Sequence, residues 1–168
     1  MNSVAGKRSD GGLPRRKTIN TQSILVVDEN PSNVKLVSYV LELEGYRVLT
    51  ASDAEEAQEI MKYCEPNLIL MDIALPGIDG LTLTRQLKAD ARTQHIIVVA
   101  LTAFAMKGDE RKAVDAGCDG YITKPIDTRS LGHVIAEFLA GGQTRNPAEK
   151  MKILRIEATQ PPGQCSKS

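Results

Sequence analysis

The sequence has few cysteines and histidines and no long apolar run, so it lacks the material of disulfide frameworks, zinc clusters and membrane spans. Its three cysteines, Cys64, Cys118 and Cys165, are an odd number without a CxxC spacing, which argues against a disulfide framework and a structural zinc site. No apolar run is long enough to cross a bilayer, and the N-terminal MNSVAGKRSDGG lacks the apolar stretch of a signal peptide. We therefore expect a cytoplasmic protein in a reducing compartment, without membrane contact.

Histidine is also scarce. His95 and His133 are the only two histidines, and neither is paired in the sequence with a Cys or Ser nucleophile, so we assign both a structural role. With 168 residues, of which 42% are hydrophobic, the chain can still bury a core, and one domain is expected.

The formal net charge of +0 conceals an acidic centre between two basic ends. Residues 1–22 contain five basic residues and one acidic residue, and residues 141–168 contain five basic and two acidic residues. The central part, residues 23–140, therefore contains 11 basic and 18 acidic residues. Basic ends can contact nucleic acid, anionic membranes or acidic partners. Because no aromatic residue interleaves these charges, we favour disordered, solubilising ends at 1–22 and 142–168 and expect no direct DNA binding.

Apolar, β-branched segments alternate with amphipathic segments between residues 23 and 141. The pattern predicts strands at 23–28, 46–51, 67–72, 95–102 and 119–123, and helices near 31–45, 53–65, 81–90, 107–117 and 128–141. Asn30 and Pro31 form an N-cap and first-turn pair, and Ser52 or Asp53 caps the second helix. Five βα units at short spacing predict an α/β fold with a five-stranded parallel sheet, doubly wound by helices on both faces.

Polar residues follow the predicted strands, where open α/β sheets bind ligands. In chain order they are Asp28 with Glu29, then Asp72, Thr102 and Lys124. Three carboxylates at one edge repel one another unless a cation joins them. A ligand set made only of oxygen atoms suits Mg²⁺, with Mn²⁺ as an alternative, and does not suit zinc. The pattern therefore predicts a magnesium site at this edge.

The motifs VVDEN, LMDIALPGIDG, ALTA and GYITKP occur in the order and spacing of a known family. From about Ser23 to Gly141 the chain resembles the receiver domain of bacterial two-component response regulators, whose chemotaxis-regulator-like members have a flavodoxin-like sheet of order 2-1-3-4-5. The resemblance implies that a histidine kinase or histidine phosphotransfer protein phosphorylates Asp72. It also implies that Mg²⁺ is held by Asp28, Glu29, Asp72 and the backbone carbonyl of Ala74.

The resemblance implies roles for three further residues. Lys124 adds a positive charge beside the phosphoryl group, and the Thr102 hydroxyl donates to a phosphoryl oxygen. Movement of Thr102 is expected to draw Tyr121 inward and to repack the face made by the fourth helix, fifth strand and fifth helix. The family usually has a cis peptide bond at the position of Lys124-Pro125, whereas X-Pro bonds are mostly trans.

The sequence departs from the family pattern at one metal position. Its acidic pair reads Asp-Glu where the family more often has Asp-Asp or Glu-Asp, so Glu29 is expected to weaken or shift Mg²⁺ binding without abolishing it. A Glu29→Asp variant should therefore differ in Mg²⁺ affinity. Ala74 and Phe104 lie two residues beyond Asp72 and Thr102, at positions that modulate water access in the family, and the bulky Phe104 is expected to slow hydrolysis.

The leading interpretation is a stand-alone receiver that signals to a downstream protein by contact, as a monomer or a phosphorylation-dependent dimer. Residues 142–168 are too few for a DNA-binding or catalytic domain of ordinary size, so no enzyme activity is expected beyond phosphotransfer to its own Asp and self-dephosphorylation. A receiver separated from a hybrid histidine kinase and a phosphate-independent receiver-like scaffold are the alternatives. The segment MKILRI, 151–156, either docks as an apolar-basic patch or is a frayed tail.

Two functions of other classes fit the sequence less well. A haloacid-dehalogenase-type phosphatase also uses an Asp nucleophile and Mg²⁺, but it needs a second Asp where this chain has Ala74. A flavodoxin-like nucleotide binder needs a loop rich in Gly, Ser or Thr after the first strand, and VVDENPSN places two acids there.

Overall fold

The computed structural model describes residues 21–103 and 107–141. Apart from Thr21 and Gln22, the predicted disordered ends lie outside the described residues, as do the MKILRI segment and Phe104. The domain limits and the role of Phe104 therefore stay predictions.

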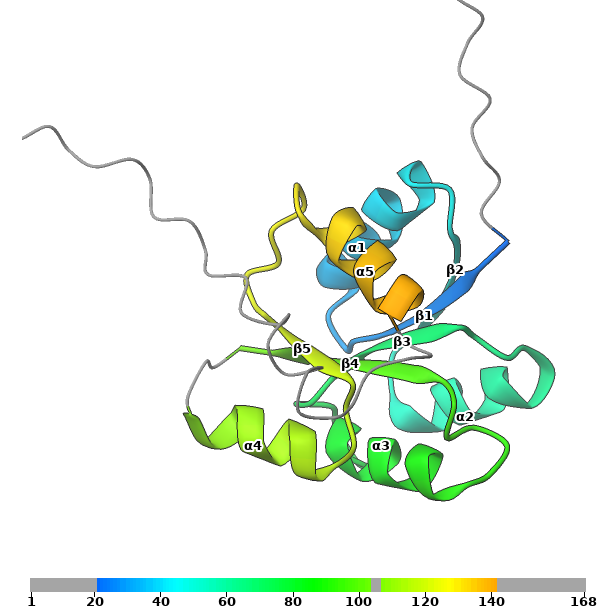
Figure 1. The fold of residues 1–168 in the computed structure, drawn as a ribbon, viewed down its shortest axis with the longest axis vertical. Coiled ribbons are helices and arrows are strands. Elements are labelled where there is room, and N and C mark those ends of the chain that lie inside the picture. Colours follow the sequence, from blue (N-terminus) through cyan, green and yellow to red (C-terminus); the bar gives the residue numbers. More distant parts are fainter. Residues whose placement is uncertain (1–20, 104–106, 142–168) are drawn as a thin grey trace, which may run out of the picture.

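Five parallel strands form a single sheet in the described part of the chain (Figure 1). They are β1 (Ser23–Val27), β2 (Arg47–Ala51), β3 (Leu68–Asp72), β4 (Ile97–Thr102) and β5 (Gly120–Thr123). Their order is β2-β1-β3-β4-β5, and every neighbouring pair is parallel. The predicted fold class and strand order are confirmed.

Helices cover both faces of the sheet. They are α1 (Pro31–Leu43), α2 (Ala54–Tyr63), α3 (Gly80–Ala89), α4 (Lys107–Asp115) and α5 (Leu131–Gly141). Figure 1 shows α1 and α5 above the sheet and α2, α3 and α4 below it. The last helix begins at Leu131 and not at the predicted Thr128, because residues 128–130 form a turn that leads into it. In this turn the Asp127 carboxylate accepts hydrogen bonds from the Arg129 N–H at 3.0 Å and the Ser130 hydroxyl at 3.1 Å, and the Leu131 N–H donates to the Asp127 carbonyl at 3.1 Å, which are the contacts of a cap.

Side-chain caps begin α1, α2 and α3. The Asn30 side chain accepts a hydrogen bond from the Ser32 N–H at 2.9 Å, with Pro31 in the first turn, as predicted. For α2 the sequence left two candidates, and the structure assigns the cap to Asp53, which accepts from the Glu56 N–H at 2.7 Å. Each cap fixes the point at which the chain leaves the sheet edge.

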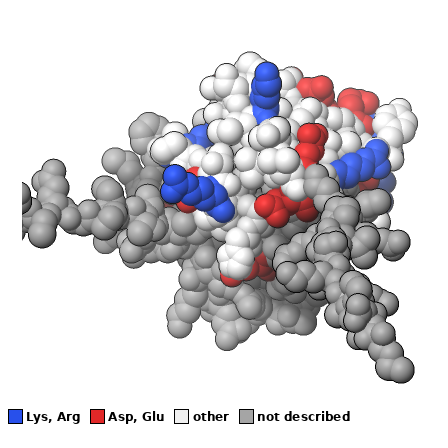
Figure 2. Space-filling view, turned by 90° about the horizontal axis from the view of Figure 1, so that it is seen from above, with Lys and Arg blue, Asp and Glu red and all other residues white. Residues whose placement is uncertain are grey.

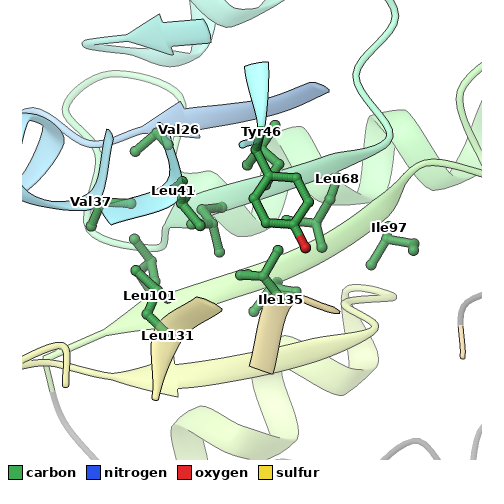
Figure 3. Close-up of a cluster of buried hydrophobic side chains, with 12 residues drawn as sticks. Val26, Val37, Leu41, Tyr46, Leu68, Ile97, Leu101, Leu131 and Ile135 are labelled. Atoms are coloured by element: carbon green, nitrogen blue, oxygen red, sulfur yellow. The ribbon is translucent and has the colours of Figure 1, made fainter. Parts of the chain in front are cut away.

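The three central strands, β1, β3 and β4, are buried on both faces, which explains why their sequences show no polar alternation. The edge strands β2 and β5 are partly exposed. On the α1 and α5 face, one cluster joins strand residues such as Ile24, Leu68 and Leu101 to Leu41 and Ile135 (Figure 3). The opposite face packs against α2 and α3, and its cluster comprises Leu25, Val27, Ile69, Met71, Val98, Ala54, Ala57, Leu83 and Leu87 among others. No helix within 21–103 and 107–141 is long and apolar enough to cross a membrane.

Candidate functional site at the carboxyl edge of the sheet

The sheet brings the predicted polar residues to one edge. Asp28 directly follows β1, Asp72 is the last residue of β3 and Thr102 is the last residue of β4. Lys124 follows β5, and its N–H donates to the Thr102 carbonyl at 2.7 Å. The Lys124-Pro125 peptide bond is cis, as in the family.

Lys124 joins the two buried carboxylates. Its ammonium donates to Asp28 Oδ2 and to Asp72 Oδ2, each at 2.7 Å. The side chains of Asp28 and Asp72 are only 1% and 7% exposed. Burial alone would lower the pKa of Lys124, but its hydrogen bonds to the two carboxylates and their negative charges raise that pKa above its ordinary value.

Amide groups also donate hydrogen bonds to the two carboxylates. Asp28 Oδ1 accepts a hydrogen bond from the Asn30 N–H at 2.8 Å, and Asp28 Oδ2 accepts one from Asn33 Nδ2 at 3.2 Å. Asp72 Oδ1 accepts one from the Ala74 N–H at 2.9 Å. Sequence reasoning missed Asn33, although its place in the first turn of α1, facing the loop that follows β1, was a usable signal. The three side chains Asp28, Asp72 and Lys124 are called the acid-lysine triad below.

The other two predicted metal ligands lie at the rim of the triad. Glu29 and Ala74 are exposed, so two of the three predicted carboxylates converge and Lys124 is the cation that joins them. Within the described residues, no group of three or more His, Cys, Asp or Glu side chains is placed to hold a metal ion. The metal ligand set stays a prediction.

The chemistry of the site still fits a hard dication. Two buried carboxylates and one ammonium leave the triad a formal charge of −1, since −2 + 1 = −1. Carboxylate oxygens have lone pairs beyond those used by Lys124 and the amides. The carboxylate of Glu29 and the backbone carbonyl of Ala74 are further oxygen donors at the rim, the type of ligand that Mg²⁺ takes.

Gly80, which sequence reasoning did not single out, positions Asp72. A Cβ atom at residue 80 would lie 2.1 Å from the Asp72 carbonyl oxygen and 2.9 Å from Met71 Cγ. The start of α3 therefore lies closer to the end of β3 than a residue with a Cβ atom at position 80 would allow. Between them the chain turns through Gly77, whose φ is +74°. The apolar run of β3 thus places Asp72 at the edge of the sheet. The chain then turns back, so that α3 begins in close contact with Asp72.

Thr102 and Tyr121 occupy the two strands at the α4 side of the sheet. Thr102 is 4% exposed. Tyr121 lies opposite Ala100 in the β4–β5 register, is half-buried, and donates a hydrogen bond from its hydroxyl to the Glu110 carboxylate of α4. Of the pair predicted to act as a switch, Thr102 therefore adjoins Lys124 of the triad, and Tyr121 contacts α4.

The outer face of α1 exposes an apolar stripe. Leu36, Tyr39 and Leu43 are 46%, 62% and 53% exposed, and their spacing puts them on one side of the helix. The view from above the α1 and α5 layer shows charged side chains scattered among uncharged surface (Figure 2). The stripe begins close to the site, because the first turn of α1 supplies Asn33 to Asp28.

Comparisons with known proteins place this geometry in a family. The model of the response regulator receiver domain matches residues 24–136. The polar-differentiation response regulator DivK of Brucella ovis is 41% identical over 119 residues, which are 71% of this chain and 97% of the relative.

Two solved structures are similar over the same region. A putative response regulator from Chloroflexus aurantiacus is 28% identical, with a TM-score of 0.69, and the match covers 72% of this chain and 99% of that one. The receiver domain of the sensor histidine kinase PA1611 from Pseudomonas aeruginosa, with a magnesium ion coordinated in its active site cleft, is 31% identical, with a TM-score of 0.66 and coverage of 72% and 99%.

Proposed function

The chain belongs to the response regulator receiver domain family, and from this premise we propose that it accepts a phosphoryl group on Asp72 and signals by protein contact. The observation that carries the proposal is the acid-lysine triad. A carboxylate 7% exposed at a sheet edge, with an ammonium 2.7 Å away, is a nucleophile whose charge is already partly offset. The phosphoryl donor is a histidine kinase or a histidine phosphotransfer protein.

The chain's own residues account for most of the chemistry. A carboxylate oxygen of Asp72 forms the new P–O bond while the P–N bond to the donor histidine breaks, and the electron pair of that bond stays with the imidazole, which takes up a proton. Lys124 neutralises charge that develops on the phosphoryl oxygens, and Asp28 holds Lys124 in place. Such transfer depends mainly on positioning and charge neutralisation.

We propose that Asp28, Glu29, Asp72 and the Ala74 carbonyl hold Mg²⁺ or, as an alternative, Mn²⁺. When bound, the ion supplies positive charge to the phosphoryl oxygens. The related receiver domain of PA1611, which has a magnesium ion coordinated in its active site cleft, supports this assignment. The longer side chain of Glu29 should make the affinity for Mg²⁺ differ from that of a Glu29→Asp variant.

Signal output in this proposal passes through Thr102 and Tyr121. The Thr102 hydroxyl donates to the phosphoryl oxygen on Asp72, and Tyr121 moves inward as Thr102 is drawn toward the site. This changes the surface made by α4, β5 and α5, and phosphorylation shifts an existing equilibrium between two conformations. In this proposal catalysis is limited to the chain's own phosphorylation and dephosphorylation, and the protein works in the cytoplasm.

The apolar stripe on α1 is the surface we propose for the phosphodonor. It runs from the turn that holds Asp28, so a donor helix lying along it brings its histidine toward Asp72. Tyr39→Ser should slow phosphotransfer from the donor protein and leave phosphorylation by acetyl phosphate unchanged. Tyr63, 85% exposed at the end of α2, provides the matched control, since Tyr63→Ser should change neither rate. Equal rates in the two variants with the donor protein would contradict this assignment.

The decisive experiment is intact-protein mass spectrometry after incubation with acetyl phosphate, with and without Mg²⁺. The wild type should gain a Mg²⁺-dependent phosphoryl adduct that the Asp72→Asn variant lacks. An adduct of equal amount in the variant would mean that the phosphoacceptor is a residue other than Asp72. If the folded wild type gains no adduct, the proposal is refuted and the phosphate-independent receiver-like scaffold is favoured.

A further inference from the structure

The α4 helix has little apolar anchoring. It reads KGDERKAVD, with six charged residues among nine, and among its described side chains Ala113 is a buried apolar one whereas Val114 is 37% exposed. By contrast, α3 buries Leu83 and Leu87, and α5 buries Leu131, Val134 and Ile135. Polar contacts therefore have a larger share in holding α4 on β5 than in holding its neighbours.

One of these polar contacts involves the switch residue. The Tyr121 hydroxyl donates to the carboxylate of Glu110, in the first turn of α4. Side chains alternate along β5, and since Ile122 packs against the cluster on the α1 and α5 side, Tyr121 faces the α4 side. A hydrogen bond to an ionised acceptor is stronger than one between neutral groups. Inward movement of the Tyr121 ring requires this bond to break.

We propose that Glu110 is a latch that holds Tyr121 at the α4 surface and biases the receiver toward its unphosphorylated conformation. The inference rests on the proposed function, since it concerns the switch of the same site. Glu110 is a positioning residue and touches neither the phosphoryl group nor the triad. Because the bond forms only with Tyr121 outward, its removal lowers the free energy of the inward conformation relative to the outward one.

The neighbouring acid provides a matched control. Asp109 lies in the same turn of α4 and carries the same charge, but its carboxylate pairs with Lys112 at 3.3 Å. Asp109→Ala and Glu110→Ala both remove one negative charge from the start of α4 and both introduce a good helix former. They differ in the loss of the acceptor for Tyr121.

The test measures how tightly the full chain binds beryllofluoride, a phosphoryl mimic, at a fixed Mg²⁺ concentration. Glu110→Ala should lower the half-saturating beryllofluoride concentration about threefold to tenfold. This range corresponds to the energy of a hydrogen bond to a charged group, reduced because the site is half-exposed to solvent. Asp109→Ala should bind as the wild type does. In a Tyr121→Phe background, Glu110→Ala should have no further effect, because the donor is already absent.

Three results separate failure of the latch from failure of the function. If wild type binds beryllofluoride and Glu110→Ala behaves like Asp109→Ala, the latch is refuted and the phosphoacceptor role stands. The latch is equally refuted if the effect of Glu110→Ala persists in the Tyr121→Phe background. If folded wild type does not bind beryllofluoride, the proposed function fails and the inference fails with it. A ¹⁹F spectrum of fluorotyrosine-labelled protein should show the Tyr121 signal shifted in Glu110→Ala and unshifted in Asp109→Ala.

Discussion

Replacing Gly80 by alanine should destabilise the fold at the site itself. The added Cβ would lie 2.1 Å from the Asp72 carbonyl oxygen, whereas close C···O contacts in proteins are about 3.3 Å. The two backbones would have to separate by roughly 1 Å, and such overpacking typically costs about 1–3 kcal/mol. We expect a loss of about 2 kcal/mol for Gly80→Ala, because the obstacle is a backbone atom and not the end of a flexible side chain.

Urea denaturation of Gly80→Ala measures this cost, with Gly108→Ala as the matched control. With an m-value of about 2 kcal/mol per M, the midpoint of Gly80→Ala should fall by roughly 1 M. A Cβ at Gly108 in α4 has no atom within 4 Å, so that variant should gain up to about 1 kcal/mol from helix propensity. A Gly80→Ala midpoint equal to that of wild type would refute the reasoning that the α3–β3 approach is fixed.

Three further predictions concern titration. The Thr82 N–H lowers the pKa of the α3 cap Asp79, so Asp79→Ala should cost about 1 kcal/mol at pH 7, a difference that disappears as the pH falls below about 4. Burial and then Glu44 raise the pKa of Tyr46, so the wild type should lose stability more steeply than Tyr46→Phe above about pH 10. Burial raises the pKa of Cys118 to about 11, so iodoacetamide at pH 8 should label it faster in urea than in the native protein.

The signs of the first two effects follow from proton linkage. A carboxylate with a lowered pKa stabilises the fold above its unfolded pKa and loses that contribution as it protonates. A phenol with a raised pKa stabilises the fold below its unfolded pKa and loses that contribution as it ionises. Urea midpoints measured across pH check both, and curves for variant and wild type that stay parallel across these ranges would contradict them. Equal labelling of Cys118 in native and unfolded protein, followed by peptide mass spectrometry, would contradict the third.

Much of the fold was predictable because its signals are local. Each of the central strands β1, β3 and β4 is a short apolar run without polar alternation, as parallel strands covered on both faces require. Asn30, Pro31 and Asp53 begin helices by contacts that span at most three positions. The helix limits were less accurate, as at Leu131, because a capped turn over residues 128–130 precedes the helix and its sequence does not separate it from the helix.

The sequence by itself determined which residues reach the edge, because a parallel sheet sends the carboxyl ends of its strands to the same side. Only the tertiary structure decided how they meet: Lys124 reaches Asp28 across 96 positions and Asp72 across 52, while Glu29 stays exposed. The close approach of Gly80 and the bond from Tyr121 to Glu110 are likewise absent from any local pattern. Periodicity and capping report on a residue's immediate neighbours, whereas the pairing of charges depends on the packing distances between whole elements.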